Sequence, residues 1–107
     1  MTDNETGLGF AAPHPGEILK HDVLPQLDMS IGEFARHLGI RRAGLSELMN
    51  GHKRVTQNMA IRLGKALQTG ARYWLAMQVQ YDLSHEIPKK AADINVSPLF
   101  KLGGDAA

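Results

Sequence analysis

The side chains best suited to chemistry lie together in the middle of the chain, and what they can do is form hydrogen bonds. Arginine can donate to O6 and N7 of guanine, alanine can touch a thymine methyl, glutamate can accept from N4 of cytosine, and serine is adaptable. A helix that presents such groups near its N-terminus can read bases in the major groove of DNA. The residues predicted to contact bases are Arg41, Arg42, Ala43, Ser46, Glu47 and Asn50, with Arg42 and Ser46 the first choices.

A second group of polar residues follows directly, in the turn after these six. Thr56 is a predicted helix cap, and the N-terminus of a helix offers free N–H groups to an anion. The residues predicted to contact phosphates are His52, Lys53, Arg54, Thr56 and Gln57. For Arg41 and Arg42 the alternative to base contact is phosphate contact alone, since more than half of protein–DNA hydrogen bonds go to the backbone.

The charge of the chain is unevenly distributed. The 107 residues have a formal net charge of +1, but residues 1–40 carry −4, residues 41–72 carry +6 and residues 73–107 carry −1. A basic block can neutralise phosphates and gives an affinity that depends on salt. The alternative is that the block is only a solvated face of the protein. Because the block coincides with the predicted base-contact residues, the sequence favours nucleic-acid binding.

The elements that must position these residues are helices. No proline occurs between Gln26 and Ile87, single glycines interrupt this stretch, and no segment alternates apolar and polar residues over the length of a strand. We therefore predict an all-α fold of five helices. They begin near Pro15, after the capping residue Ser30, near Arg41, after Thr56 and near Ala71. Pro25 is expected to disturb the first helix.

The second and third helices have the pattern of a helix-turn-helix. Gly39 can make the sharp turn between them, and Ala35 is small enough for a close crossing. The apolar residues that would pack the two helices together are Phe34, Leu38, Ile40, Leu45 and Leu48. The alternative is a plain helical bundle, because the same geometry occurs in proteins that bind no DNA.

The fifth helix, about Ala71 to Leu83, has two apolar edges. Trp74, Met77 and Tyr81 lie on one edge, and Leu75, Val79 and Leu83 on the other. One edge can pack on the domain while the other meets a partner. The first edge is our candidate for a dimer or partner surface, although its aromatic residues are more often part of a core.

The chain divides into three predicted regions: a flexible segment at 1–13, a helix-turn-helix domain at 14–84 and a partly ordered tail at 85–107. Pro88 to Ala91 resembles a linker. The apolar residues beyond it favour a tail docked on its own domain, with a partner-binding segment as the alternative. Those residues are Ile94, Val96, Leu99, Phe100 and Leu102.

Other kinds of chemistry find little support. The chain has no cysteine, and its five histidines form no HExxH pattern, so we predict no metal site and no cofactor. Glu33 and His37, one helical turn apart, are better explained as a solvated pair. No nucleophile elbow or phosphate loop is present, so we do not expect an enzyme. Asp3 and Glu5 stand where a signal peptide would be basic, and no apolar run could span a membrane, which predicts a cytoplasmic protein with no membrane partner.

The region from His14 to Leu83 resembles the HigA antitoxins, a branch of the Xre-type helix-turn-helix regulators also called virulence-associated protein I. The resemblance covers about two-thirds of the chain. It rests on HPGE at 14–17, LMNG at 48–51, MAIRL at 59–63 and YWLAMQVQYDL at 73–83, which is similar to the family's WLxLQxxYDL ending.

The resemblance implies a compact, lambda-repressor-like domain that acts as a homodimer on a palindromic operator. It also implies a partner, a HigB toxin, which is a RelE-like ribosome-dependent mRNA endonuclease, and repression of the operon that encodes both. The alternatives are a solitary Xre-type repressor without a toxin and an interaction module that no longer meets DNA. Arg41 stands where many Xre-type proteins have a capping Ser or Thr, and Ala43 and Gly44 are bare, so the operator sequence does not follow from the family.

Overall fold

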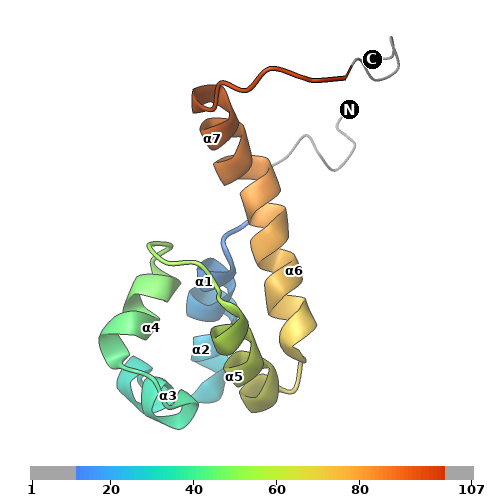
Figure 1. The fold of residues 1–107 in the computed structure, drawn as a ribbon. Coiled ribbons are helices and arrows are strands. Elements are labelled where there is room, and N and C mark those ends of the chain that lie inside the picture. Colours follow the sequence, from blue (N-terminus) through green and yellow to red (C-terminus); the bar gives the residue numbers. More distant parts are fainter. Residues whose placement is uncertain (1–11, 101–107) are drawn as a thin grey trace, which may run out of the picture.

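The computed structural model describes residues 12–100 and folds them into five helical segments, with no strand in that range (Figure 1). The predicted all-α, five-helix fold is confirmed. The first segment comprises α1 (Pro15–Ile18), η1 (Leu19–Val23) and α2 (Leu24–Leu27), where η marks a π-helical turn. Then follow α3 (Ile31–Leu38), α4 (Arg42–Met49) and α5 (Gln57–Leu67). The last segment comprises α6 (Ala71–Tyr81), η2 (Asp82–Glu86) and α7 (Ile87–Asp93).

The first segment runs through Pro25 instead of ending there. His14 caps its start, because its Nδ1 accepts the Gly16 N–H at 2.9 Å. The Leu24 N–H bonds to the Leu19 carbonyl, five residues back, so the helix widens by one residue just before the proline. A wide turn of this kind relieves the clash that a proline ring makes with the preceding turn. The expected disturbance is thus a π-helical turn, and the helix continues to Leu27.

The helix-turn-helix follows from local signals. Ser30 and Glu33 form a capping box at the start of α3, with Ser30 N–H to Glu33 Oε1 at 2.8 Å and Glu33 N–H to Ser30 Oγ at 3.0 Å. Hydrogen bonds that the Ser30 backbone and side chain donate to the carboxylate stabilise its ionised form and hold the pKa of Glu33 below its ordinary value. Gly39 ends α3 with a φ of 76°, a left-handed conformation that glycine adopts without strain. The chain then reverses into α4.

The core lies where α1 to α6 converge. Trp74 and Phe34 are the largest of its fully buried side chains. Gly16 allows α1 to approach the end of α4 closely, because a Cβ there would lie 1.8 Å from the Leu48 carbonyl oxygen. The buried apolar residues are Leu19, Phe34, Ala35, Leu38, Leu45, Leu48, Met49, Val55, Ala60, Leu63 and Trp74.

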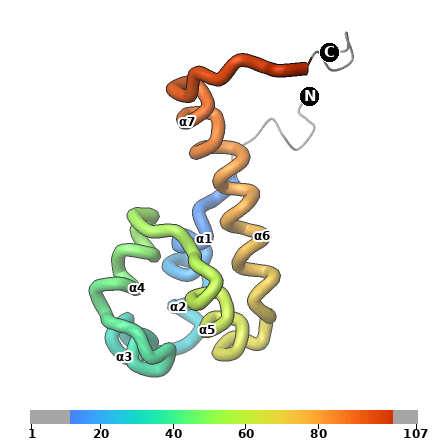
Figure 2. Tube along the Cα trace, in the orientation of Figure 1, coloured from blue at the N-terminus to red at the C-terminus, as the bar shows by residue number. Residues whose placement is uncertain are grey.

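The last segment projects beyond the core as α7 and an extended stretch (Figure 2). The predicted linker at Pro88 to Ala91 is wrong, because these residues form most of α7, and Pro88 directly follows the π-helical turn η2. The docked tail is also wrong for residues 94–100, since α7 carries them away from the domain. Ile94, Val96, Leu99 and Phe100 are 64%, 78%, 92% and 78% exposed. Residues 1–11 of the predicted flexible segment and 101–107 of the tail lie outside the described residues.

Candidate nucleic-acid interface

Helix α4 has one buried face and one exposed face. Leu45, Leu48 and Met49 anchor it in the core. Of the six predicted base-contact residues, Ser46 is half-buried; the five exposed ones are Arg41, Arg42, Ala43, Glu47 and Asn50. The structure therefore brings all six together on the outward side of the second helix of the helix-turn-helix.

Two guanidinium groups stand at the start of this helix. Arg41 occupies the capping position of α4 but its side chain makes no capping hydrogen bond. The Arg42 side chain crosses the first turn of α3, since a Cβ on Gly32 would lie 3.6 Å from Arg42 Cδ. Within residues 12–100 neither guanidinium has a hydrogen bond or an ion pair. Both remain able to bind a ligand outside the protein.

Gly44, inside α4, has no neighbour on its outer side. A Cβ built at this position would meet no atom within 4 Å. A glycine inside a helix costs about 1 kcal/mol relative to alanine. Nothing in the packing of the domain therefore requires glycine here.

The other end of α4 is held by two lysines. Lys53 Nζ lies 3.0 Å from Glu47 Oε1, and both side chains are exposed. Lys20, which belongs to η1, donates from Nζ to Asn50 Oδ1 at 2.9 Å. Asn50 Nδ2 in turn lies 3.5 Å from Ser46 Oγ. Sequence reasoning missed Lys20, because it lies 30 residues away in an acidic part of the chain.

The predicted phosphate-contact residues are exposed but differ in their partners. Thr56 caps α5, its hydroxyl accepting the Met59 N–H at 3.2 Å. His52, Lys53 and Gln57 lie on the same exposed stretch. Arg54 is different, because it forms a two-pronged contact with the Asp82 carboxylate at 2.8 and 3.3 Å. Of the five candidates, Arg54 is thus the one most occupied by the protein itself.

Asp82 joins the turn after α4 to the last helical segment. Its Oδ1 also accepts from Gln78 Nε2 at 3.0 Å, and Gln78 Oε1 accepts the Val55 N–H at 2.7 Å. Partial burial raises the pKa of Asp82, but the bonds from Arg54 and Gln78 outweigh it, and the net effect lowers the pKa below its ordinary value of 3.8. Gln78 is 2% exposed and was not identified from the sequence. The only sequence signal for the burial of Gln78 is that it lies one helical turn after Trp74.

Arg62 is part of the basic block but has a structural role. Its Nη1 donates to the Leu38 carbonyl at 2.7 Å, at the end of α3, and its Nε donates to Asn58 Oδ1 at 2.7 Å. The last carbonyls of a helix need such partners. Arg62 therefore fastens the helix-turn-helix to α5, and the +6 charge of the block overstates the charge that is free for DNA.

The predicted partner surface at Trp74, Met77 and Tyr81 needs correction. Trp74 is 1% exposed and donates from Nε1 to Thr69 Oγ1 at 2.8 Å, so it belongs to the core. Met77 is half-buried against the core. Tyr81 is half-buried too, with its ring edge-on to His14 at 4.9 Å and stacked on His85 at 4.4 Å. This edge of α6, which also includes the buried Gln78, therefore faces the core.

The exposed apolar side chains of the last segment follow a different line. Val79, Leu83 and Ile87 are spaced four residues apart and are 50%, 50% and 49% exposed. Residues with this spacing share one face of a helix. This exposed apolar face is here called the outer stripe.

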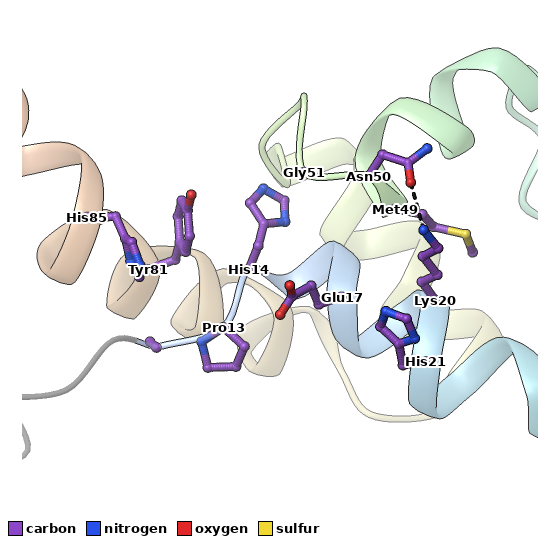
Figure 3. Close-up of a pocket in the computed structure, with 11 residues that line it drawn as sticks. Pro13, His14, Glu17, Lys20, His21, Met49, Asn50, Gly51, Tyr81 and His85 are labelled. Atoms are coloured by element: carbon purple, nitrogen blue, oxygen red, sulfur yellow. Dashed lines mark hydrogen bonds between the residues drawn. The ribbon is translucent and has the colours of Figure 1, made fainter.

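An open groove of about 590 Å³ lies between the first segment, the end of α4 and α6 (Figure 3). His14, His21 and His85 line it together with Glu17 and Lys20. Burial lowers the pKa of His14, while a bond to the Lys53 carbonyl raises it less, so the pKa lies below its ordinary value of 6.5. Within residues 12–100 no three His, Asp or Glu side chains lie close enough to hold a metal.

No helix in the described part of the chain is long and apolar enough to cross a membrane.

The comparisons with known proteins agree with this geometry. The helix-turn-helix family pattern matches residues 23–74. Virulence-associated protein A′ of Dichelobacter nodosus is 42% identical over 82 residues, which is 76% of this chain and 70% of the relative. An addiction module antidote protein of the HigA family from Coxiella burnetii superimposes with a TM-score of 0.71 at 32% identity, over 83% of this chain and 99% of that one.

A further solved structure contains DNA. The Pseudomonas aeruginosa antitoxin HigA, solved with the higBA promoter, superimposes with a TM-score of 0.72 at 30% identity, over 83% of this chain and 99% of that one. The fold, the match and the exposed face of α4 define a helix-turn-helix protein. More narrowly, the chain belongs to the family of Xre-type proteins that includes the HigA antitoxins and the virulence-associated proteins.

Proposed function

We propose that this protein is a DNA-binding antitoxin that represses its own operon through α4. The observation that carries the proposal is the start of α4, where the Arg41 and Arg42 guanidinium groups have no partner within residues 12–100. Arginine in that position can bond guanine in the major groove. The promoter-bound HigA of P. aeruginosa, which has the same fold, supports a DNA partner.

The division of labour on this face follows from the contacts. The residues proposed to read bases lie on the outward side of α4: Arg41, Arg42, Ala43 and Ser46 near its start, and Glu47 and Asn50 toward its end. His52, Lys53, Thr56 and Gln57 are proposed to contact phosphates, aided by the N-terminus of α5. Arg54 is paired with Asp82, so its proposed role is mainly to hold the turn after α4 against the last helical segment.

A dimer is part of the proposal. Two half-sites one helical turn apart, about 34 Å, require two copies of α4. The outer stripe offers each copy an apolar surface for the other, since Val79, Leu83 and Ile87 are about half exposed. A palindromic operator then matches the two-fold symmetry of the pair.

The proposed second partner is a HigB-like toxin, a RelE-like mRNA endonuclease encoded beside this protein, which the antitoxin neutralises in the cytoplasm without catalysis of its own. Membership of the HigA-containing family supports this assignment. The competing function is that of a solitary repressor with no toxin, which shares every DNA-contact residue named above.

Gel shift on the DNA upstream of the gene, over a salt series, tests the DNA-binding half. We expect binding that weakens steeply with salt, because counterions are released from each neutralised phosphate. The Arg42→Ala, Ser46→Ala double variant should bind at least about tenfold more weakly. Arg72→Ala removes an exposed charge on α6 and serves as the control, with a loss below about threefold. Equal binding by wild type and the double variant contradicts the assignment of α4.

Expression of the neighbouring reading frame tests the toxin half. We expect that frame alone to stop growth, coexpression with this protein to restore growth, and the two proteins to co-purify. A neighbour that is harmless by itself leaves the solitary repressor as the function.

A further inference from the structure

The contact between Lys20 and Asn50 joins the first helical segment to the end of α4. The Lys20 ammonium reaches across the groove of Figure 3 to Asn50 Oδ1, at 2.9 Å. Asn50 follows the last residue of α4, and its backbone N–H bonds to the Ser46 carbonyl, so its side chain starts from a fixed place on the helix.

Lysine decides which way the Asn50 amide is turned. An ammonium group has three donors and no acceptor, whereas the amide has an acceptor end and a donor end. The opposite orientation would place the Asn50 NH₂ group against the Lys20 ammonium. Oδ1 must therefore face Lys20, which leaves Nδ2 directed to the side of Ser46 Oγ, at 3.5 Å.

The second acceptor on the exposed face of α4 is held in the same manner. Glu47 Oε1 lies 3.0 Å from Lys53 Nζ. The groups with no lysine partner are Arg41, Arg42, the Ser46 hydroxyl and Asn50 Nδ2, and each of them can donate. Each of the two lysines thus engages one acceptor at the end of α4, while the guanidinium donors of Arg41 and Arg42 stay available.

We propose that Lys20 is a specificity-determining positioning residue that biases Asn50 toward donation. The inference rests on the proposed function. Asparagine recognises adenine with two bonds only when its oxygen accepts from N6 while its nitrogen donates to N7. The Lys20 ammonium takes one of the two lone pairs of Oδ1 and stands beside it, which hinders the two-bond fit to adenine. Asn50 therefore favours an edge that offers acceptors, namely O6 and N7 of guanine or O4 of thymine. The operator class is therefore one with guanine or thymine opposite Asn50.

Selection of bound sequences from a library of randomised duplexes, with the full chain, tests this inference. The Asn50→Ala variant first identifies the base position that Asn50 reads, because preference should vanish there alone. Wild type should enrich guanine or thymine at that position. In Lys20→Met, which keeps the aliphatic stem, the ratio of adenine to guanine plus thymine should rise about tenfold at the same position.

The control is Lys65→Met, which removes an equal charge from an exposed position on α5. It should lower affinity evenly and keep every base preference. Thermal unfolding of each variant checks that the fold is intact, and we expect it to be, because Lys20 and Lys65 are both exposed.

Three results overturn the inference. If Lys20→Met lowers affinity for all sequences alike, Lys20 is a phosphate contact only. If Asn50→Ala changes no position, Asn50 reads no base. If wild type enriches adenine opposite Asn50, the amide is not biased toward donation. A wild-type protein that enriches no sequence at all contradicts instead the proposed function.

Discussion

The first and last helical segments both contain a π-helical turn directly before a proline, but one segment is packed in the core and the other is exposed. In the first, the Leu24 N–H bonds to the Leu19 carbonyl and Pro25 follows; in the last, the Ile87 N–H bonds to the Asp82 carbonyl and Pro88 follows. Each proline is thus preceded by one π-helical turn, and each helix continues beyond it.

The surroundings decide what each segment does. Leu19, in the first π-helical turn, is completely buried, whereas Leu83, in the second, is 50% exposed. The first segment packs on α4 and carries the Lys20 that reaches Asn50. The last segment leaves the core and presents the outer stripe. Proline placement therefore sets the local backbone, and burial determines whether that backbone supports the domain or extends from it.

Alanine substitution of the two leucines should give the largest difference between the segments. Leu19→Ala should lower the free energy of unfolding by about 3 kcal/mol, because it leaves a cavity in the core. Leu83→Ala should cost less than about 1 kcal/mol in dilute monomeric protein. Urea unfolding of both variants measures the difference. Equal losses would mean that the outer stripe is packed in solution.

An intermediate effect is expected from the link between the last segment and the domain. Asp82→Asn removes the charge that faces Arg54, and should cost about 1 kcal/mol at neutral pH because Arg54 is largely exposed and screened. With the pKa of Asp82 lowered, the contribution is present above pH 3.8 and is lost as pH falls through the folded-state value.

Thermal unfolding of Asp82→Asn at low and high salt is the measurement for this link. Lys89→Ala, which removes an exposed contact at 4.0 Å to Glu86, is the matched control and should change stability little. A larger loss in the control would place the important ion pair farther out on α7.

The smallest effect concerns the start of the first segment. His14 accepts the Gly16 N–H only when neutral, and burial lowers its pKa below 6.5, so the unfolded chain binds the proton more readily. The stability that His14 provides is complete above pH 6.5 and declines as pH falls toward the folded-state pKa. His14→Asn keeps a capping side chain that does not titrate. Urea unfolding at several pH values should show a shallower decline in this variant, and an unchanged slope would contradict the assignment.

Much of the fold follows from short-range signals. The capping box of Ser30 and Glu33 starts one helix, Gly39 ends it, and Thr56 caps another. Each of these residues acts within a few positions of itself, so its role can be predicted from the sequence. The helix-turn-helix and the exposed face of α4 follow from them. That the six candidates on α4 contact bases stays a prediction.

The remainder depends on contacts between distant parts of the chain. Pro25 and Pro88 were expected to interrupt helices, but a π-helical turn before each one absorbs the strain. Gln78 is buried because Val55, 23 residues away, supplies its partner. Arg62 and Arg54 count as free charges in the sequence, yet their partners are a carbonyl on α3 and a carboxylate on η2. Trp74, a candidate for the partner surface, is buried in the core instead, where its indole N–H bonds to Thr69.

The open space at Gly44 bears on how such a protein can diverge. Any small side chain placed there gains helix propensity and adds a new group to the outward face of α4 without disturbing the core. A substitution that changes the target sequence usually lowers the stability of the protein. At Gly44 a single substitution can raise stability and also add a new contact group. This makes Gly44 a natural starting point for a change of target sequence, by evolution or by design.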